Sequence, residues 1–264
     1  MRLVTWNINS IRLRIDLLRQ VASVMNPDIV CLQEIKVDDP LFPLDECREM
    51  GFEHVAFHGM KGYNGVAILS RLPMAEIRPL SRCGRDDRRH LMARLENGVE
   101  VHCLYIPAGG DEPDPEINDK FAHKLDFVRE ITAWAAAEIK PDSKAILAGD
   151  FNIAPLETDV WSHKQLLKVV SHTPVEVELL NAFQASVPFV DAVRHFVPPE
   201  EKLFTWWSYR SPDWQRNDRG RRLDHVWVTP ALAPALRGTL VAREARSWVQ
   251  PSDHVPVMVD FDLS

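Results

Sequence analysis

The chain has 264 residues, of which 45% are apolar, and a formal net charge of −7. This length predicts one domain over residues 1–264. No apolar stretch approaches the ~20 residues that cross a bilayer, so we expect no membrane partner. The first ten residues lack a secretory signal and the four cysteines are widely spaced, so we expect a cytoplasmic protein, and a monomer because no pattern demands an oligomer.

The predicted elements alternate between strands and helices along the chain. Apolar and β-branched residues predict strands over residues 3–8 and 28–32, and the spacing between them predicts a helix over residues 11–25 that Asn26-Pro27 ends. Further strands are predicted over residues 66–69, 91–95 and 99–105. A surface loop over residues 107–119 precedes the clearest helix, residues 121–139.

Three more strands are predicted in the second half of the chain, over residues 145–148, 223–228 and 255–261. After the strand over residues 145–148, a stretch without one clear pattern of strand or helix continues to about residue 199, before the other two strands. This mixture of strands and helices predicts an α/β (α+β) architecture, with two layers of sheet covered by helices.

Polar side chains gather where these strands begin or end. They are Asn7, Glu34, Asp150, Asn152, Asp224, Asp253 and His254. Each alone has an ordinary structural interpretation, since an aspartate after a strand is typical of an Asx-turn or a helix cap. Together they favour a functional site, because so many carboxylates and amides are costly to bury without a purpose.

The residue types in this set indicate which chemistry the site performs. Hard oxygen ligands, without thiolates or clustered imidazoles, favour Mg²⁺, or Mn²⁺, over zinc. Mg²⁺ held by carboxylates is most often used on phosphates, where it neutralises developing negative charge. The chain contains no G-x-S-x-G elbow of a serine hydrolase and no H-E-x-x-H zinc motif. The sequence therefore predicts metal-dependent hydrolysis of a phosphate ester.

Eight motifs follow one another over nearly the whole chain. They are TWNINSIRLR (residues 5–14), LQEIK (32–36), KGYNGVAILS (61–70), the strand that ends at Tyr105, GDFNIAP (149–155), FTWWSYRS (204–211), RRLDHVWVT (221–229) and PSDHVPV (251–257). In this order they resemble the exonuclease III family of abasic-site endonucleases, within the endonuclease/exonuclease/phosphatase superfamily. The resemblance implies a four-layer αββα sandwich of two mixed β-sheets flanked by helices.

The activity implied by the resemblance is DNA repair on double-stranded DNA. It comprises Mg²⁺-dependent hydrolysis 5′ to abasic sites, 3′-5′ exonuclease activity and 3′-phosphatase activity on blocked 3′ ends. For the metal, the resemblance implies Glu34 as the principal ligand, with Asn7 supporting it and Asp253 contributing.

The catalytic residues that the resemblance implies act on the water and the scissile phosphate. Asp150 would orient or deprotonate the attacking water, and Asn152 would donate to the phosphate. His254, held by Asp224, would stabilise the developing negative charge, since the aspartate favours the protonated imidazole. Tyr105 would donate its hydroxyl to the phosphate or help the leaving oxygen. Whether Asp150 or His254 is the general base stays open at this point.

Residues that contact DNA are also implied by the resemblance: Lys61, Asn64, Arg88, Trp206, Arg210 and Leu223. Trp206 and Leu223 would line a pocket for the flipped, base-less sugar. An apolar pocket that fits only this sugar excludes an intact nucleotide sterically. We expect Trp207 in the core instead. Arginine-rich segments over residues 81–90 and 210–222 keep a DNA partner compatible with the negative net charge. For the polar residues of this group, the alternative is plain solvated surface.

Three stretches depart from the family pattern. Ala108 stands where many relatives have an amide, residues 111–119 are acidic, and residues 156–175 match weakly. Ala108 puts one phosphate contact in question, and the acidic residues bear on how the DNA is held. Loops within residues 156–175 bear on the balance between abasic-site incision, 3′-end trimming and removal of 3′-phosphates. Two other functions stay open: a superfamily phosphatase or phosphodiesterase that acts on a non-DNA substrate, and a catalytically silent nucleic-acid-binding protein. The pocket motifs favour DNA over the first, and the unreplaced catalytic positions disfavour the second.

Overall fold

The centre of the molecule is a pair of six-stranded mixed sheets packed face to face. The computed structural model describes residues 1–211 and 213–263. The first sheet has the strand order β13-β14-β1-β2-β4-β3, with β1 and β2 parallel and the other neighbours antiparallel. Its strands are β1 (Arg2–Asn7), β2 (Ile29–Gln33), β3 (His54–His58), β4 (Val66–Ser70), β13 (Leu236–Val241) and β14 (Val257–Phe261).

The second sheet has the strand order β5-β6-β7-β8-β12-β9, and here β7 and β8 are the parallel pair. Its strands are β5 (Met74–Pro79), β6 (His90–Leu95), β7 (Glu100–Tyr105), β8 (Ala145–Asp150), β9 (Val190–Asp191) and β12 (Asp224–Val228). A short hairpin of β10 (Trp206–Trp207) and β11 (Gly220–Arg221) lies outside both sheets.

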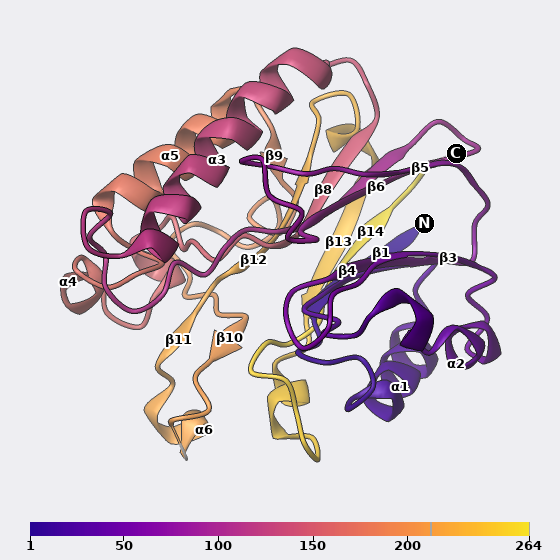
Figure 1. Ribbon diagram of the computed structural model, residues 1–264, viewed down its shortest axis with the longest axis horizontal. Helices are drawn as coiled ribbons and strands as arrows, with labels where there is room; N and C mark the ends of the chain where they lie inside the picture. The colour runs from indigo at the N-terminus through magenta and orange to yellow at the C-terminus, as the bar shows by residue number, and fades with distance from the viewer. Residues whose placement is uncertain (212, 264) are drawn as a thin grey trace.

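Helices cover the outer face of each sheet. α1 (Ile15–Met25) and α2 (Leu44–Glu49) lie on the first sheet, and α3 (Asp119–Glu138) and α5 (Pro174–Ala185) lie on the second (Figure 1). Two shorter helices, α4 (His163–Leu166) and α6 (Trp214–Asn217), lie near the β10–β11 hairpin (Figure 1). This arrangement confirms the predicted sandwich of helix, sheet, sheet and helix.

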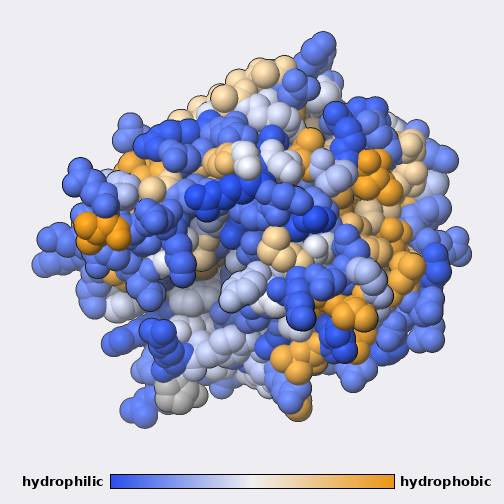
Figure 2. All heavy atoms as spheres, viewed as in Figure 1, coloured by the Kyte–Doolittle hydropathy of each residue, from blue (hydrophilic) through white to orange (hydrophobic). Residues whose placement is uncertain are grey.

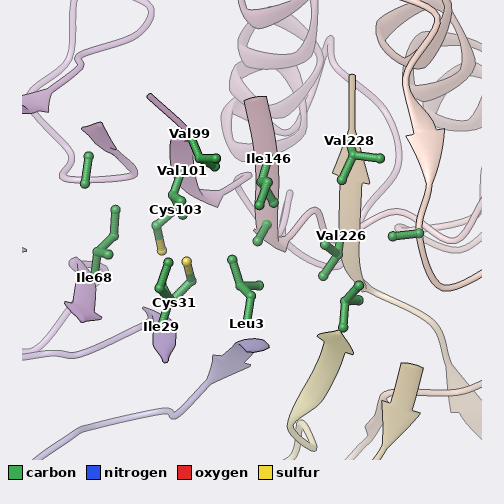
Figure 3. Packing of buried hydrophobic residues seen from close by; sticks show 14 of the residues in the cluster. Leu3, Ile29, Cys31, Ile68, Val99, Val101, Cys103, Ile146, Val226 and Val228 are labelled. Atoms are coloured by element: carbon green, nitrogen blue, oxygen red, sulfur yellow. The ribbon is translucent and has the colours of Figure 1, made fainter. Parts of the chain in front are cut away.

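The main core lies between the two sheets. Because side chains alternate along a strand, Leu3 of β1 and Cys31 of β2 point toward Cys103 of β7 and Ile146 of β8 (Figure 3). The opposite faces of the same strands pack under the helices, as Trp6 does beneath α1. All five side chains are at most 1% exposed, so each strand contributes to two layers of core.

The surface is mainly polar on the face that Figure 2 shows, and the hydrophobic residues on it gather mostly toward the right side of the view. Single exposed apolar residues such as Val249 and Ile117 come from unrelated segments, which is ordinary for a folded protein. Among the described residues, no helix has the length and apolar character needed to cross a membrane.

Both parallel strand pairs end at the same region of the molecule. Asn7 pairs with Gln33 at the carboxyl ends of β1 and β2, and Tyr105 pairs with Asp150 at the carboxyl ends of β7 and β8. Gly149 allows the second pair to approach closely, because a Cβ atom there would lie 1.8 Å from the carbonyl oxygen of Leu104. The polar residues that follow these four strands are therefore brought together across the two sheets.

A buried ion network anchors the segment that enters β12. Arg222, only 1% exposed, donates to both carboxylate oxygens of Asp159 at 2.7 and 3.0 Å and to Asp191 at 2.6 Å. Arg194 donates to the same Asp159 at 2.5 Å. The guanidinium of Arg222 thus holds a loop and β9 against the strand that begins at Asp224.

Removing this guanidinium should strongly destabilise the protein. We expect Arg222→Leu to lower the free energy of unfolding by about 3–5 kcal/mol, because the buried carboxylate of Asp159 and the largely buried one of Asp191 lose their main partner. Urea unfolding measures the loss, with Arg237→Ala as the exposed control at less than about 1 kcal/mol. A loss below about 1 kcal/mol in the Arg222 variant would contradict this account.

The same network should make the loss depend on pH. Burial would raise the pKa of Asp159 and of Asp191, but Arg222, together with Arg194 at Asp159 and His225 at Asp191, outweighs burial and holds both pKa values below their usual range. Carboxylates with a lowered pKa stabilise the fold above their unfolded pKa, and this stabilisation is lost as pH falls. The difference between wild type and Arg222→Leu should therefore shrink below about pH 4.

Candidate active site

A cleft of about 460 Å³, called the central cleft below, opens where the central strands of both sheets end. Its lining includes seven of the residues that the sequence predicted: Glu34, Asn152, Trp206, Arg210, Leu223, Asp253 and His254. Four more are buried next to it and hydrogen-bond to residues of the lining: Asn7, Tyr105, Asp150 and Asp224. The fold thus gathers the predicted catalytic and metal-binding residues at one place.

Glu34 follows β2 with a left-handed backbone, at φ 52°, which is uncommon for a residue other than glycine. Its Oε1 accepts from the amide of Asn7 at 2.9 Å and from the hydroxyl of Tyr105 at 2.8 Å, and its Oε2 lies 2.7 Å from Nζ of Lys36. Burial acts to raise the pKa of Glu34, but Lys36 and these donors outweigh it and lower the pKa. Glu34 is therefore held as a carboxylate.

Tyr105 keeps its proton in this environment. Its pKa is raised well above the usual value, first by burial and then by the charge of Glu34. A protonated phenol beside an ionised carboxylate is a hydrogen-bond donor, and the 2.8 Å contact agrees with that role.

Asp150 and Asn152 form a tight turn after β8. The backbone N–H of Asn152 donates to Oδ1 of Asp150 at 2.9 Å, and its side-chain amide donates to Oδ2 at 3.1 Å and to the carbonyl oxygen of Ile106 at 2.9 Å. The amide of Asn7 donates to both Asp150 and Glu34, at 2.9 Å each, and so links the two sheets. Asp150 is 1% exposed, and burial raises its pKa to about 7.

His254 lies between two carboxylates. Its Nδ1 is 2.8 Å from Oδ2 of Asp224, and its Nε2 is 3.6 Å from Oδ2 of Asp150. Thr205 donates to the same oxygen of Asp224 at 2.6 Å. Burial would lower the pKa of His254, but the charges of Asp224 and Asp150 outweigh it and raise the pKa to about 10. At neutral pH the imidazole is therefore protonated, while Asp150 lies near its midpoint.

The side-chain oxygens of Glu34, Asn9 and Asp253 suit a hard cation. Nζ of Lys36 lies 2.7 Å from both Oε2 of Glu34 and Oδ1 of Asn9, so these oxygens already surround one positive charge. Asp253 stands further along, and its two oxygens accept from the side chains of Asn9 at 3.1 Å and Trp206 at 2.9 Å. Oxygen donors of this kind fit Mg²⁺ or Mn²⁺.

A second arrangement of potential ligands lies deeper. Asp150, Asp224 and His254 each place one ligand atom within 4.8 Å of the others. The protonated imidazole already bridges the two carboxylates there, so this group fits a divalent cation less well than the oxygens around Glu34.

The two adjacent tryptophans differ as expected. Trp207 is 1% exposed and packs in the core with Phe204 and Trp214, whereas Trp206 is half-buried and lines the central cleft beside Leu223. Arg221 completes this wall and places its guanidinium 5.1 Å from the centre of the Trp206 ring. Arg221 was not predicted, because the sequence does not show which arginine of a basic segment lines a cleft and which ones are solvated.

Three residues predicted to contact DNA lie outside the central cleft. Asn64 lines a neighbouring cleft of about 540 Å³, Arg88 pairs with Asp86 at 2.9 Å, and Lys61 is exposed. Arg89, which the sequence interpretation did not select, also lines the neighbouring cleft and stacks 4.6 Å from the centre of the Tyr105 ring. The basic segment therefore contributes a different arginine beside Tyr105.

A fully buried ion pair supports the central cleft from behind. Lys124 of α3 and Glu176 of α5 are both 0% exposed, and Nζ lies 2.5 Å from Oε1. Lys124 also donates to the carbonyl oxygen of Asn152 at 2.8 Å, and Glu176 accepts from the backbone of Ser171 at 2.9 Å. The pair thus connects two loops of the cleft. Helical spacing places Lys124 on a buried face, but a lysine there does not reveal its partner in sequence.

Breaking this pair should affect both stability and chemistry. We expect Lys124→Met to cost about 3–5 kcal/mol of unfolding free energy, because Glu176 is left buried without its cation. Displacement of Asn152 should also lower the catalytic rate, on the order of 10²-fold for a shift of about 1 Å. The Lys124→Met/Glu176→Gln variant should lose less stability than the sum of the two single variants, and simple additivity would contradict the coupling.

Known proteins resemble this chain over its full length. The endonuclease/exonuclease/phosphatase family matches residues 4–254. Exodeoxyribonuclease III of Haemophilus influenzae is 30% identical, over 99% of this chain and 100% of the relative. The structure of an AP endonuclease from Archaeoglobus fulgidus has a TM-score of 0.93 at 30% identity, with 100% of both chains covered. The 3′ phosphatase NExo from Neisseria, solved bound to a product DNA hairpin, has a TM-score of 0.91 at 32% identity, with 99% of both covered. The chain therefore belongs to the endonuclease/exonuclease/phosphatase family and, within it, to the exonuclease III-type nucleases of DNA repair.

Proposed function

We propose that this chain hydrolyses the phosphodiester bond 5′ to an abasic site in double-stranded DNA, with Mg²⁺ as its cofactor. We include 3′-5′ exonuclease and 3′-phosphatase activity on blocked 3′ ends. The observation that carries the proposal is the central cleft, where Glu34, Asn152 and His254 face the wall of Trp206 and Leu223. The likeness to an AP endonuclease and to a 3′ phosphatase supports these activities. We propose a monomer as the active unit.

Glu34 is the proposed principal ligand of the metal, and Mn²⁺ suits the same oxygen donors. Asn7 fixes the orientation of this carboxylate through its 2.9 Å hydrogen bond. Asp253 is the proposed further ligand, which would have to exchange its bond to Asn9 or to Trp206. A divalent cation bound here supplies positive charge that polarises the scissile phosphate and neutralises charge on the leaving oxygen.

The protein groups handle the water and the phosphate in this proposal. Asp150, with its pKa near 7, takes the proton of the attacking water. His254 remains protonated at neutral pH, so it serves as a fixed positive charge and hydrogen-bond donor to the phosphate rather than as the base. Asn152 exchanges its 3.1 Å hydrogen bond to Asp150 for one to a phosphate oxygen. Tyr105, which keeps its proton, donates a hydrogen bond to the leaving oxygen.

Substrate selection follows from the wall of the cleft. A base-less sugar can pack against the Trp206 ring and the Leu223 side chain, and extruding a nucleotide costs least where the base is already missing. Arg210 lines the same cleft and is exposed, so it can reach a backbone phosphate. We propose that Lys61, Asn64 and Arg88 contact the duplex farther from the reacting bond.

The test is incision of a duplex oligonucleotide that carries one abasic analogue, in Mg²⁺ and in EDTA. We expect a single cut 5′ to the analogue in Mg²⁺ and none in EDTA. The same duplex without the analogue, and an inositol phosphate, serve as control substrates. An enzyme that leaves the abasic duplex intact in Mg²⁺ but releases phosphate from the inositol compound would contradict the proposal.

A further inference from the structure

A second cleft, of about 340 Å³, is lined by Trp206 but by none of the proposed catalytic or metal-binding residues. We call it the Trp161 cleft, after the half-buried tryptophan that lines it together with Asn217, Arg219 and residues of the β10–β11 hairpin. Neither the sequence motifs nor the proposed chemistry uses Trp161 or Arg219. The cleft therefore needs its own explanation.

The chemistry of the Trp161 cleft is aromatic and cationic. Its described lining contains Trp161, Arg210, Arg219 and Arg221 and no carboxylate. The guanidinium of Arg219 stacks 4.7 Å from the centre of the Trp161 ring. Among residues 1–211 and 213–263, Arg210, Arg219 and Arg221 form no ion pair, whereas Arg89 of the neighbouring cleft pairs with Asp87 at 2.6 Å. An aromatic face beside unpaired guanidinium groups suits a nucleotide, which offers a planar base and a phosphate.

The Trp161 cleft is continuous with the central cleft. Trp206, Ser208, Arg210 and Arg221 line both of them, so the two clefts share one wall. In the proposed function the base-less sugar packs against this shared wall from the central cleft. The strand must continue from that sugar through its 3′ oxygen, because the bond that is cut lies on its 5′ side. The next phosphate and nucleoside must therefore leave the central cleft, and the Trp161 cleft adjoins it at the shared wall.

We infer that the Trp161 cleft binds the nucleotide immediately 3′ to the abasic site, with its phosphate at Arg210 and Arg219 and its nucleoside against the Trp161 ring. This inference rests on the proposed function, since it takes the direction of the strand from the position of the base-less sugar. It makes Trp161 and Arg219 specificity residues for internal abasic sites. They contribute nothing to a substrate that ends at the sugar.

Two duplex substrates separate this role from a general effect on the enzyme. One carries the abasic analogue inside the strand, and the other carries it as the last residue of the 3′ end. We expect Trp161→Ala and Arg219→Ala to lower kcat/KM for the internal analogue by roughly tenfold and to leave the terminal analogue within about twofold. Trp161→Phe, which keeps an aromatic face, should restore most of the loss.

Salt dependence gives a second readout that loss of packing would not change. Each phosphate contact contributes about 0.9 to the slope of log K against log salt concentration for duplex DNA. Arg219→Ala should therefore reduce the slope for the internal analogue by about one contact, whereas Trp161→Ala should leave it unchanged. The control is Arg237→Ala, an exposed arginine at the start of β13, away from both clefts, which should change neither rate nor slope.

Several results would overturn the inference. Equal losses on the internal and the terminal analogue would assign Trp161 a packing role. A loss confined to removal of an intact 3′ nucleotide would mean that the cleft holds the base of the excised residue. Unchanged kinetics in both variants would leave the cleft without a role in binding DNA. Failure of the wild-type enzyme on both analogues would refute the proposed function and this inference together, and it would be seen before any variant is compared.

Discussion

Replacing Asp150 with asparagine should slow strand cleavage by about 10²- to 10⁴-fold and leave DNA affinity nearly unchanged. Asparagine keeps the size of the side chain but cannot accept a proton, and removal of a key catalytic group costs about 3–5 kcal/mol of transition-state stabilisation. The hydrogen bond from Asn7 to Asp150 can persist in the variant, because an amide oxygen also accepts. Single-turnover cleavage of the abasic duplex, together with equilibrium binding in Ca²⁺, measures the two quantities separately.

The pH profile provides the control for this prediction. In the wild type the single-turnover rate should rise as pH increases through about 7, because only the ionised form of Asp150 accepts the proton. A cation bound at Glu34 adds positive charge nearby and moves this rise to lower pH. The rise should be absent from Asp150→Asn. A variant within tenfold of the wild-type rate, with the same pH profile, would assign the proton transfer to another group.

Replacing Glu34 with glutamine should raise the Mg²⁺ concentration for half-maximal activity by at least 10- to 100-fold. That range is typical of losing a group that only supports a metal ligand, so loss of the ligand charge itself should cost no less. Lys36 and the donors Asn7 and Tyr105 hold Glu34 ionised. A glutamine in its place cannot supply the negative charge that the cation needs. Cleavage rates over a Mg²⁺ titration measure the shift.

The matched control for Glu34 is Tyr105→Phe. It removes the 2.8 Å hydrogen bond but keeps the carboxylate, so we expect a smaller shift in the Mg²⁺ requirement and a lower maximal rate. Direct binding of Mn²⁺ to the two variants, without DNA, separates metal affinity from catalysis. An unchanged Mn²⁺ affinity in Glu34→Gln would show that other residues hold the metal.

Periodicity predicted the central elements of the fold well, because the buried strands are short apolar runs with clear ends. The helix expected from residue 11 instead begins at Ile15. The backbone N–H of Ile11 is used by a tertiary hydrogen bond to Ile35 at 3.1 Å, and this contact is invisible in the local pattern. The strands β3 and β13 were not predicted, since their exposed edge positions mix polar and apolar residues.

The candidate site was predictable where residue type alone limits the chemistry. Carboxylates and amides at strand ends indicated the cluster around Glu34 and Asp150, which the structure brings together. Arg221, Lys124 and Trp161 could not be selected, because arginine, lysine and tryptophan occur at many positions for ordinary reasons. Their importance depends on a distance to a partner that lies far away in the chain, such as the 2.5 Å between Lys124 and Glu176.

The side-chain amide of Asn7 donates one hydrogen bond to each sheet's carboxylate, Glu34 on one side and Asp150 on the other. In the proposed mechanism Glu34 holds the cation and Asp150 holds the water. The distance between cation and water therefore depends on the spacing between the two sheets, which the core sets. A methyl group removed from Leu3 or Ile146, deep between the layers, would alter that spacing far from any substrate contact. The packing between the sheets therefore affects activity as well as stability.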